Sequence, residues 1–271
     1  MRTVDLGPIG AVLSPDQDGF VETAHQLEGL GYSTIWVTGG PLAGLDQIAD
    51  VVRATTTARI ASGIIPVDRF PADDVIALYS ALEAEQPGRF VVGLGGAHGA
   101  DPMATLNAYL DRVEPAIPQS ARLMAALGPK MFSLAKERAG GALPVLVTPE
   151  YTARARALLG DDTTLAVEQL VVLSTDPQHA RELARGPLGF LGAVPAYQAN
   201  FRRMGFGDDD ITQRSDRLVD ALVPWGDADA AARQVAKQRQ AGADHVAVSI
   251  VANGPPTIDQ WREIADVLIS R

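Results

Sequence analysis

The stretch Arg89–Gly99, RFVVGLGGAHG, organises the sequence. Its first half is a continuous run of bulky and β-branched apolar residues, which is typical of a strand buried on both faces. Its second half contains glycines that allow positive φ angles and let a flat ligand or a phosphate approach the backbone: Gly93, Gly95, Gly96 and Gly99. The one imidazole of this turn is His98. As the fourth strand of a parallel barrel, the stretch would place His98 at the C-terminal end, where such barrels hold their active sites.

Apolar stretches of this kind alternate with amphipathic helical stretches through most of the chain. We predict strands at residues 7–13, 32–38, 59–65, 90–94, 123–127, 143–147, 165–173 and 244–251. Ser14-Pro15 and Thr148-Pro149 follow two of these strands, and both pairs are typical of helix starts. The alternation favours a (β/α)8 TIM barrel over an open doubly wound sheet, which normally has a glycine-rich turn after its first strand.

Residues 176–223 depart from this alternation, because they indicate helices without an intervening strand and include Tyr197 among aromatic and amide-rich residues. We interpret them as a helical insertion after the seventh strand. A chain of 271 residues that is 46% apolar can bury a large core. We therefore predict a single TIM-barrel domain over residues 1–271.

The composition excludes several classes of function. A formal charge of -10, with no local basic patch, opposes binding to a nucleic-acid backbone. The absence of cysteine excludes disulfides, thiolate metal sites and cysteine nucleophiles. No run approaches the roughly 18 to 20 apolar residues of a membrane span, and the N-terminal residues lack the pattern of a signal peptide. We expect a cytoplasmic protein that acts on a small molecule and binds neither nucleic acid nor membrane.

Barrel geometry separates the histidines, because only residues at the C-terminal ends of the strands share the active-site face. His25 and His179 lie within predicted helices, and His245 begins the last strand at the opposite end of the barrel. We interpret these three as structural. His98 is the exception, with two interpretations open: a functional group, or a residue that stabilises the glycine turn by hydrogen bonding.

Few other ionisable residues are predicted at this face. Asp68 and Arg69 follow the third strand, where they could line the face or form a surface ion pair, which we favour. No carboxylate pair, metal-ligand cluster or Ser-His-Asp set converges there, which argues against hydrolysis by a protein nucleophile or a metal. A face rich in glycine and poor in acids and bases suits a bound organic cofactor.

Three longer segments resemble a known family. They are Ala61–Pro71, ASGIIPVDRFP; Gly88–Gly99, GRFVVGLGGAHG; and Ala125–Tyr151, AALGPKMFSLAKERAGGALPVLVTPEY. Their order and phrasing resemble the luciferase-like family of flavin and deazaflavin oxidoreductases and monooxygenases, and most closely its actinobacterial branch that depends on coenzyme F420. Residues 215–227 and 241–248 extend the likeness over nearly the whole chain.

The resemblance implies a barrel that binds F420, or FMN in other branches, at its C-terminal face and passes hydride to or from a small organic substrate. It also implies a homodimer, no metal, a catalytic role for His98 in positioning substrate or exchanging a proton, and a cis peptide bond between Gly63 and Ile64. The cofactor contacts that it implies are Thr38, Gly63, Ile64, Pro66, Gly95, Gly96, Leu127 and Gly128.

Two departures from the family pattern keep a second hypothesis open. Relatives often carry an acidic residue or histidine directly after the second strand, where this chain has Thr38, Gly39 and Gly40, and often asparagine at the position of Pro66. Both changes remove polar contacts from the expected cofactor site. The alternative is a cofactor-free or cofactor-altered barrel that binds a ligand without turnover.

Overall fold

The computed structural model describes residues 4–269. The strands are β1 (Ile9–Leu13), β2 (Thr34–Thr38), β3 (Arg59–Gly63), β4 (Ile65–Pro66), β5 (Phe90–Gly95), β6 (Arg122–Ala125), β7 (Gly141–Leu143), β8 (Thr164–Leu173), β9 (Trp225–Gly226) and β10 (His245–Ile250). The helices are α1 (Phe20–Gly29), α2 (Asp46–Ala54), α3 (Ala72–Glu85), α4 (Pro102–Val113), α5 (Pro129–Arg138), α6 (Pro149–Leu159), α7 (Pro177–Leu191), α8 (Pro195–Arg203), α9 (Asp208–Gln213), α10 (Asp216–Leu222), α11 (Ala228–Gln240) and α12 (Ile258–Leu268), with a 3-10 turn at Gln119–Ala121.

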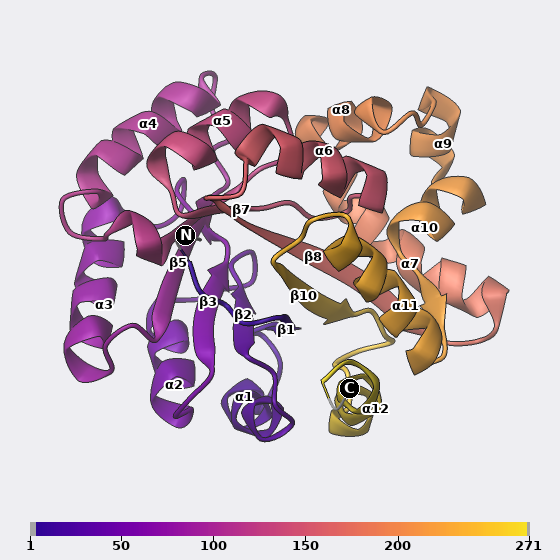
Figure 1. Cartoon of the computed structure of the whole chain (residues 1–271), viewed down its shortest axis with the longest axis horizontal. Coiled ribbons are helices and arrows are strands. Elements are labelled where there is room, and N and C mark those ends of the chain that lie inside the picture. Colours follow the sequence, from indigo (N-terminus) through magenta and orange to yellow (C-terminus); the bar gives the residue numbers. More distant parts are fainter. Residues whose placement is uncertain (1–3, 270–271) are drawn as a thin grey trace.

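The strands form a closed parallel barrel. β10 pairs with β1 on one side and with β8 on the other, so the sheet has no free edge between its first and last strands. β4 continues the position of β3 by pairing with β5, and β9 pairs in parallel with the end of β8. Within residues 4–269 this gives eight barrel positions with helices outside them, as Figure 1 shows. The predicted (β/α)8 barrel is confirmed.

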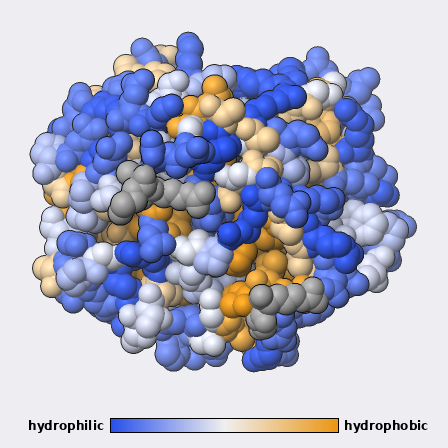
Figure 2. All heavy atoms as spheres, viewed as in Figure 1, coloured by the Kyte–Doolittle hydropathy of each residue, from blue (hydrophilic) through white to orange (hydrophobic). Residues whose placement is uncertain are grey.

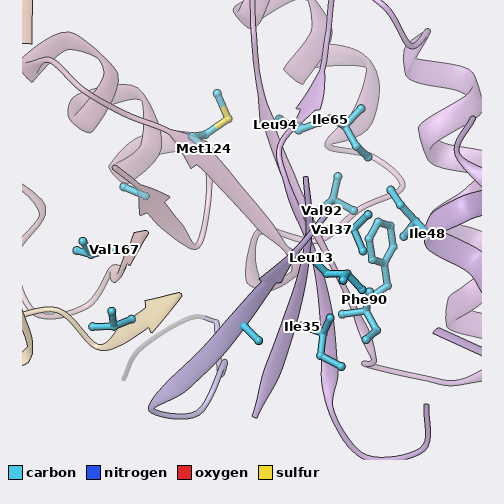
Figure 3. Packing of buried hydrophobic residues seen from close by; sticks show 14 of the residues in the cluster. Leu13, Ile35, Val37, Ile48, Ile65, Phe90, Val92, Leu94, Met124 and Val167 are labelled. Carbon is cyan, nitrogen blue, oxygen red and sulfur yellow. The ribbon is translucent and has the colours of Figure 1, made fainter. Parts of the chain in front are cut away.

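Alternating strand residues build two apolar layers. One face of each strand packs outward against the helices, and Figure 3 shows Leu13, Val37 and Phe90 gathered beside Ile48 of α2. Fully burying each such side chain stabilises the fold by about 1.5–3 kcal/mol. The opposite faces fill the barrel interior with a smaller apolar cluster: Val4, Leu6, Val12, Trp36, Ala61, Val91, Leu123, Leu143, Ala166 and Ala247.

Residues 177–222 carry α7, α8, α9 and α10 and no strand. Figure 1 shows α8, α9 and α10 grouped on one side of the barrel. They enclose a separate apolar cluster that includes Leu188, Phe201, Leu218 and Leu222. The face shown in Figure 2 is mainly hydrophilic, with hydrophobic residues in patches between polar ones. No helix among residues 4–269 is long and apolar enough to cross a membrane.

The structure corrects the predicted start of the first helix. α1 begins at Phe20, after Gly19 with φ 70°, and not at Ser14-Pro15. The Ser14 hydroxyl donates to the Asp16 carboxylate at 2.5 Å, so its side chain stabilises a turn and does not cap a helix. Thr148, in contrast, caps α6 by accepting from the Tyr151 backbone N–H, as predicted.

The sixth barrel strand also lies earlier than predicted. β7 is Gly141–Leu143, whereas we predicted residues 143–147. Pro144 follows the strand and has no backbone N–H for the ladder, and Leu146 has a positive φ of 54°. Only an isolated bridge between Val145 and Glu168 continues the pairing. The fifth predicted strand is likewise shorter at its C-terminal end, because β6 ends at Ala125.

Candidate functional site

A cavity of about 480 Å³ opens at the C-terminal ends of the barrel strands. This volume lies within the roughly 300–1,000 Å³ typical of small-molecule sites. The barrel contributes the walls and the segment after β8 contributes part of the rim. The lining residues are Ser14, Gln17, Thr38, Gly40, Pro41, Gly63, Ile64, Ala125, Leu143, Val145, Glu168, Leu170, Pro187, Phe190, Leu191, Tyr197, Ser249, Ile250, Val251, Ala252, Gly254 and Pro256.

Three of the predicted cofactor contacts, Thr38, Gly63 and Ile64, line this cavity. The peptide bond between Gly63 and Ile64 is cis, as predicted, and it separates β3 from β4. A Cβ atom at Gly39 would lie 1.5 Å from the Ile64 carbonyl oxygen. No side chain therefore fits at Gly39, which accounts for the glycine directly after the second strand.

In the RFVVGLGGAHG stretch, other parts of the protein fill the space beside Gly95 and Gly96. A Cβ at Gly95 would lie 2.8 Å from the Ala125 Cβ and 3.2 Å from Ile64 side-chain atoms. A Cβ at Gly96 would lie 3.2 Å from Pro66 atoms. Within the described residues, the cavity wall is formed by Ile64 and Ala125. Pro66, Gly95 and Gly96 do not line it. Their contact with a cofactor stays a prediction.

His98 lies at the rim, where its side chain is 65% exposed. Its Nδ1 lies 3.1 Å from the Asp68 carboxylate, and its backbone N–H donates to the same oxygen at 2.7 Å. His98 does not appear in the cavity lining within residues 4–269. The geometry matches that of a loop held by its own hydrogen bonds, and a catalytic role for His98 stays a prediction.

Arg69 does not form the surface ion pair with Asp68 that we favoured. Its guanidinium donates to the carbonyl oxygens of Gly40 and Leu42, both at 2.5 Å. Arg69 therefore holds the loop after β2, which forms one wall of the cavity. Asp68 pairs with His98 instead.

Glu168 is the cavity residue that the sequence reasoning missed. It lies on β8, level with Ala247 of β10 and bridged to Val145, so its side chain shares a strand face with Ala166 of the barrel interior and with Leu170 of the cavity lining. Its carboxyl has no hydrogen bond and no ion pair among residues 4–269, and burial raises its pKa to about 7. This carboxyl can therefore exchange a proton near neutral pH.

Helices α7 and α8 cover one side of the cavity. Tyr197 of α8 faces the same space as Glu168, and burial followed by the charge of Glu168 raises the pKa of its phenol. Phe190 of α7 also lines the cavity and is 79% exposed, which makes it one of the few large apolar side chains that the described fold leaves open to solvent. The inserted residues 177–222 thus contribute to the site itself.

A signal for Glu168 was present in the sequence. It is the acidic residue of TLAVEQLVVL, an otherwise apolar strand, and a carboxylate in such a run is more informative than an exposed one. Strand ends and loops are the usual positions of barrel active-site residues, whereas Glu168 lies in the middle of a long strand. Its alternation with Ala166 and Leu170 was the available clue.

Leu127 and Gly128 lie in the turn before α5, and neither lines the cavity within residues 4–269. The Tyr151 hydroxyl donates to the Leu127 carbonyl oxygen. A Cβ at Gly128 would lie 3.4 Å from both terminal nitrogens of Arg203, at the end of α8. Arg203 lies six positions after Tyr197 on the same helix, about 9 Å along its axis, so α8 connects the cavity wall to a cationic group beside Gly128.

The fold is shared with solved enzymes of low sequence identity. No protein-family sequence model matches the chain, and no curated protein is similar to it in sequence. An F420-dependent secondary alcohol dehydrogenase with a bound F420-acetone adduct superimposes with a TM-score of 0.74 at 14% identity, over 97% of this chain and 98% of the other. The coenzyme F420-dependent tetrahydromethanopterin reductase of Methanopyrus kandleri gives a TM-score of 0.70 at 15% identity, over 98% and 99% of the two chains.

The structure of an FMN enzyme is also similar to this chain, with a slightly lower TM-score. The oxygenating constituent of 3,6-diketocamphane monooxygenase of Pseudomonas putida, a type II Baeyer–Villiger monooxygenase in complex with FMN, gives a TM-score of 0.68 at 12% identity, over 97% of this chain and 99% of the other. Nearly complete coverage of both chains means that the likeness includes the inserted helices. This chain therefore has the fold of luciferase-like F420 and FMN enzymes.

Proposed function

We propose that this protein is an oxidoreductase that binds F420 or FMN with the ring system in the cavity and passes hydride to or from a small organic substrate. The observation that carries this proposal is the apolar cavity at the C-terminal ends of the strands, in a fold shared over its whole length with F420 and FMN enzymes. Barrels of this kind hold their active sites at this end.

The cavity residues fit a flat ring better than they fit a phosphate. Glu168 is the ionisable carboxyl of the described lining, and the other walls are apolar side chains, glycines, hydroxyls and the amide of Gln17. We infer that Thr38, Gly63 and Ile64 contact the ring. The phosphate-bearing chain would leave the cavity toward Leu127 and Gly128, where the Arg203 guanidinium supplies positive charge.

The bound group would supply the hydride, and the protein would supply position and exclusion of water. Pro66, Gly95 and Gly96 would hold Ile64 in this position. Gly95 packs against the Ile64 side chain and pairs with Pro66, and Gly96 packs against Pro66, at the break between β3 and β4. We propose F420 as the preferred cofactor, following the closest family resemblance, with FMN as the second choice.

Equilibrium binding tests the proposal directly. Purified protein is titrated with F420, FMN and NADPH in separate experiments, and melting temperature and cofactor absorbance are recorded. A ligand that binds the native state stabilises it by RT ln(1 + [L]/Kd), about 2.7 kcal/mol at one hundred times Kd. F420 should give the largest shift, and a shift with none of the three would contradict the proposal.

A matched pair of variants locates the binding site. Val145→Phe adds bulk to the cavity wall and should abolish the shift, because packed interiors do not absorb an added ring. Leu158→Phe makes a comparable addition on α6, where Leu158 is 48% exposed, and should leave the shift unchanged. Equal binding by both variants would place the cofactor elsewhere.

A barrel that binds an uncharged ligand without turnover is the second candidate. The observation that favours it is the lack of any lysine, arginine or histidine in the described lining, so no cation faces a phosphate inside the cavity itself. This candidate predicts thermal stabilisation by small apolar molecules such as cyclohexanone and none by F420 or FMN.

We further propose that the protein acts as a homodimer. Ala77 and Ala81 are exposed on α3 and Leu78 is only partly buried there, so this helix presents small and apolar residues outside its core-facing stripe. Light scattering should give twice the mass of the chain at micromolar concentration. A monomer mass would contradict this proposal.

A further inference from the structure

The carboxyl of Glu168 has a position that its contacts do not explain. It lies half-buried on the cavity wall inside the barrel, yet no hydrogen bond or ion pair joins its oxygens to any of residues 4–269. Buried ionisable groups in proteins are normally paired, because an unpaired one destabilises the fold. A carboxyl that faces a cavity without a partner is therefore arranged for something that enters the cavity.

Two of the hydroxyl groups that line the same cavity belong to Tyr197 and Ser249. Tyr197 reaches the cavity from α8, and Ser249 reaches it from β10, two residues beyond Ala247, the partner of Glu168 across the sheet. Neither hydroxyl has a hydrogen-bond partner among the described residues. The carboxyl, the phenol and the serine hydroxyl thus form a group of three hydrogen-bonding side chains on an apolar wall.

We propose that Glu168 is the catalytic acid and base of this site, and that it exchanges its proton with the oxygen of an uncharged ketone or aldehyde, or of the corresponding alcohol. Tyr197 and Ser249 orient the same oxygen by hydrogen bonding. This inference rests on the proposed function, which supplies the hydride. It assigns to a β8 residue the proton exchange that the family resemblance implied for His98.

In reduction, the carbonyl π bond breaks, its carbon gains a hydride from a reduced deazaflavin or flavin, and its oxygen gains the proton of the Glu168 carboxyl. The products are an alcohol, the oxidised cofactor and the Glu168 carboxylate, which is reprotonated from solvent. In alcohol oxidation the Glu168 carboxylate would accept the hydroxyl proton, and the carbon would pass its hydride to the oxidised deazaflavin or flavin, which leaves the carbonyl compound and the reduced cofactor.

The same surroundings select for uncharged substrates. A carboxylate or phosphate on the substrate would meet no cation in the described lining, and it would be repelled once Glu168 loses its proton. Burial raises the pKa of Glu168 to about 7, so both of its protonation states are accessible under ordinary conditions. The site therefore suits a neutral, mainly apolar carbonyl compound.

The first experiment compares three variants with the wild type. Glu168→Gln keeps the shape and the hydrogen bonding but carries no exchangeable acid proton, so turnover of 2-pentanone with reduced F420 should fall about 10²- to 10⁴-fold. His98→Gln and the surface control Glu137→Gln should each stay within about threefold of wild type. All four proteins should bind F420 equally. A loss with His98→Gln comparable to that expected for Glu168→Gln would overturn the assignment.

The second experiment needs no turnover. The side-chain carboxyl carbon of Glu168 is followed by ¹³C NMR in the cofactor-free protein, with Glu168→Gln used to assign its signal. The proposal requires a titration midpoint near 7, well above the ordinary value of about 4.3. A midpoint below about 5 would overturn it, because the carboxyl would then not be protonated when the substrate binds.

The third experiment tests substrate charge. 2-Pentanone and 4-oxopentanoate carry the same methyl ketone, but the second adds a carboxylate. 2-Pentanone should have the lower KM, and Glu168→Gln should narrow the difference between the two compounds above about pH 7. Equal KM values in the wild type, or turnover of neither compound by a protein that binds F420, would overturn the substrate class.

The two levels of inference fail in different ways. If F420, FMN and NADPH all fail to bind to the wild type, the proposed function is wrong and the role of Glu168 is wrong with it. If cofactor binds and Glu168→Gln keeps full turnover with an unchanged pH profile, only the role of Glu168 is wrong. A Glu168→Gln variant that binds cofactor normally shows that loss of turnover is not loss of folding.

Discussion

The barrel interior contains two ionisable side chains one layer apart, and their surroundings are opposite. His245 lies level with Ala166, and Glu168 lies level with Ala247, on neighbouring strands. The His245 Nδ1 donates to the Gly7 carbonyl oxygen at 2.8 Å, and its Nε2 accepts from the indole of Trp36 at 2.9 Å. Glu168 has no partner within residues 4–269 and faces the open cavity.

Burial favours the neutral form of both groups, with opposite shifts. It lowers the pKa of His245 to about 4 and raises the pKa of Glu168 to about 7. His245 is fully satisfied in its neutral form, so the N-terminal end of the barrel is built for stability. Glu168 is left with unused hydrogen-bonding capacity at the end where barrels do chemistry. A carboxyl without a partner lowers the stability of the fold, and such a loss of stability is expected at a functional site.

Adding the same side chain at each end should give the largest contrast. A Cβ at Gly10 would lie 2.7 Å from the His245 Nε2 and 2.8 Å from the Trp36 Nε1, whereas a Cβ at Gly40 meets no atom within 4 Å. Gly10→Val should lower the free energy of unfolding by about 3 kcal/mol or more. Gly40→Val should change it by less than about 1 kcal/mol. Urea unfolding followed by circular dichroism measures both, and similar losses would contradict the contrast.

Removing the lower imidazole should have the next largest effect. His245→Leu leaves the Trp36 indole N–H and the Gly7 carbonyl oxygen unpaired, which should destabilise the protein by about 2 kcal/mol near pH 7.

The difference should shrink in acid. Because the folded pKa of His245 is about 4 and its ordinary value is about 6.5, the unfolded wild type binds a proton between these values that the folded state does not. Wild-type stability should therefore decrease as the pH is lowered through this window, and His245→Leu should lack that component. Denaturation curves at several pH values measure it, and a constant difference between the two proteins would be the contrary result.

The barrel could be predicted because its pattern is local. Eight apolar stretches, each followed by turn residues and a helical stripe, are visible without knowledge of tertiary contacts, and the interruption at Gly63 and Ile64 followed from family resemblance. The start of α1 and the end of β7 were misjudged because Ser14 bonds to Asp16 and because Pro144 ends the ladder. The exact ends of helices and strands depend on which local hydrogen bonds the tertiary structure permits.

The candidate site was harder to predict than the fold. The glycine turn after the fourth strand was read as open space for a ligand, yet Ile64 and Ala125 fill the space at Gly95, and Pro66 fills that at Gly96. A glycine indicates that other atoms come close to the backbone, and the sequence does not say whether those atoms belong to a ligand or to the protein. Glu168 was overlooked for the complementary reason, since the register of β8 decides that its carboxyl faces the cavity.

Glu168→Gln should have the opposite effect to His245→Leu on stability. The folded pKa of Glu168 is about 7 and its ordinary value is lower, so the folded state holds a proton that the unfolded state releases as pH rises between them. Wild-type stability should therefore fall with rising pH across this window. Glu168→Gln should be more stable than wild type by about 1–2 kcal/mol near pH 8, with no difference near pH 4. Thermal melts at both values measure this, and a destabilised glutamine variant would mean that Glu168 is a structural group.

We expect the smallest effect on stability for a substitution at the cavity rim, smaller than for the substitutions at either end of the barrel interior. Phe190 is 79% exposed, so Phe190→Ala should change the free energy of unfolding by less than about 0.5 kcal/mol. Phe190 also lines the cavity from α7, where its ring can cover a bound apolar molecule, so the same change should raise the KM for 2-pentanone several-fold without lowering kcat. Leu158→Ala, on an exposed part of α6, should change neither quantity. An unchanged KM for Phe190→Ala would show that the inserted helices border the site without taking part in substrate binding, and a fall in kcat as well would mean that the ring helps to order the reacting groups.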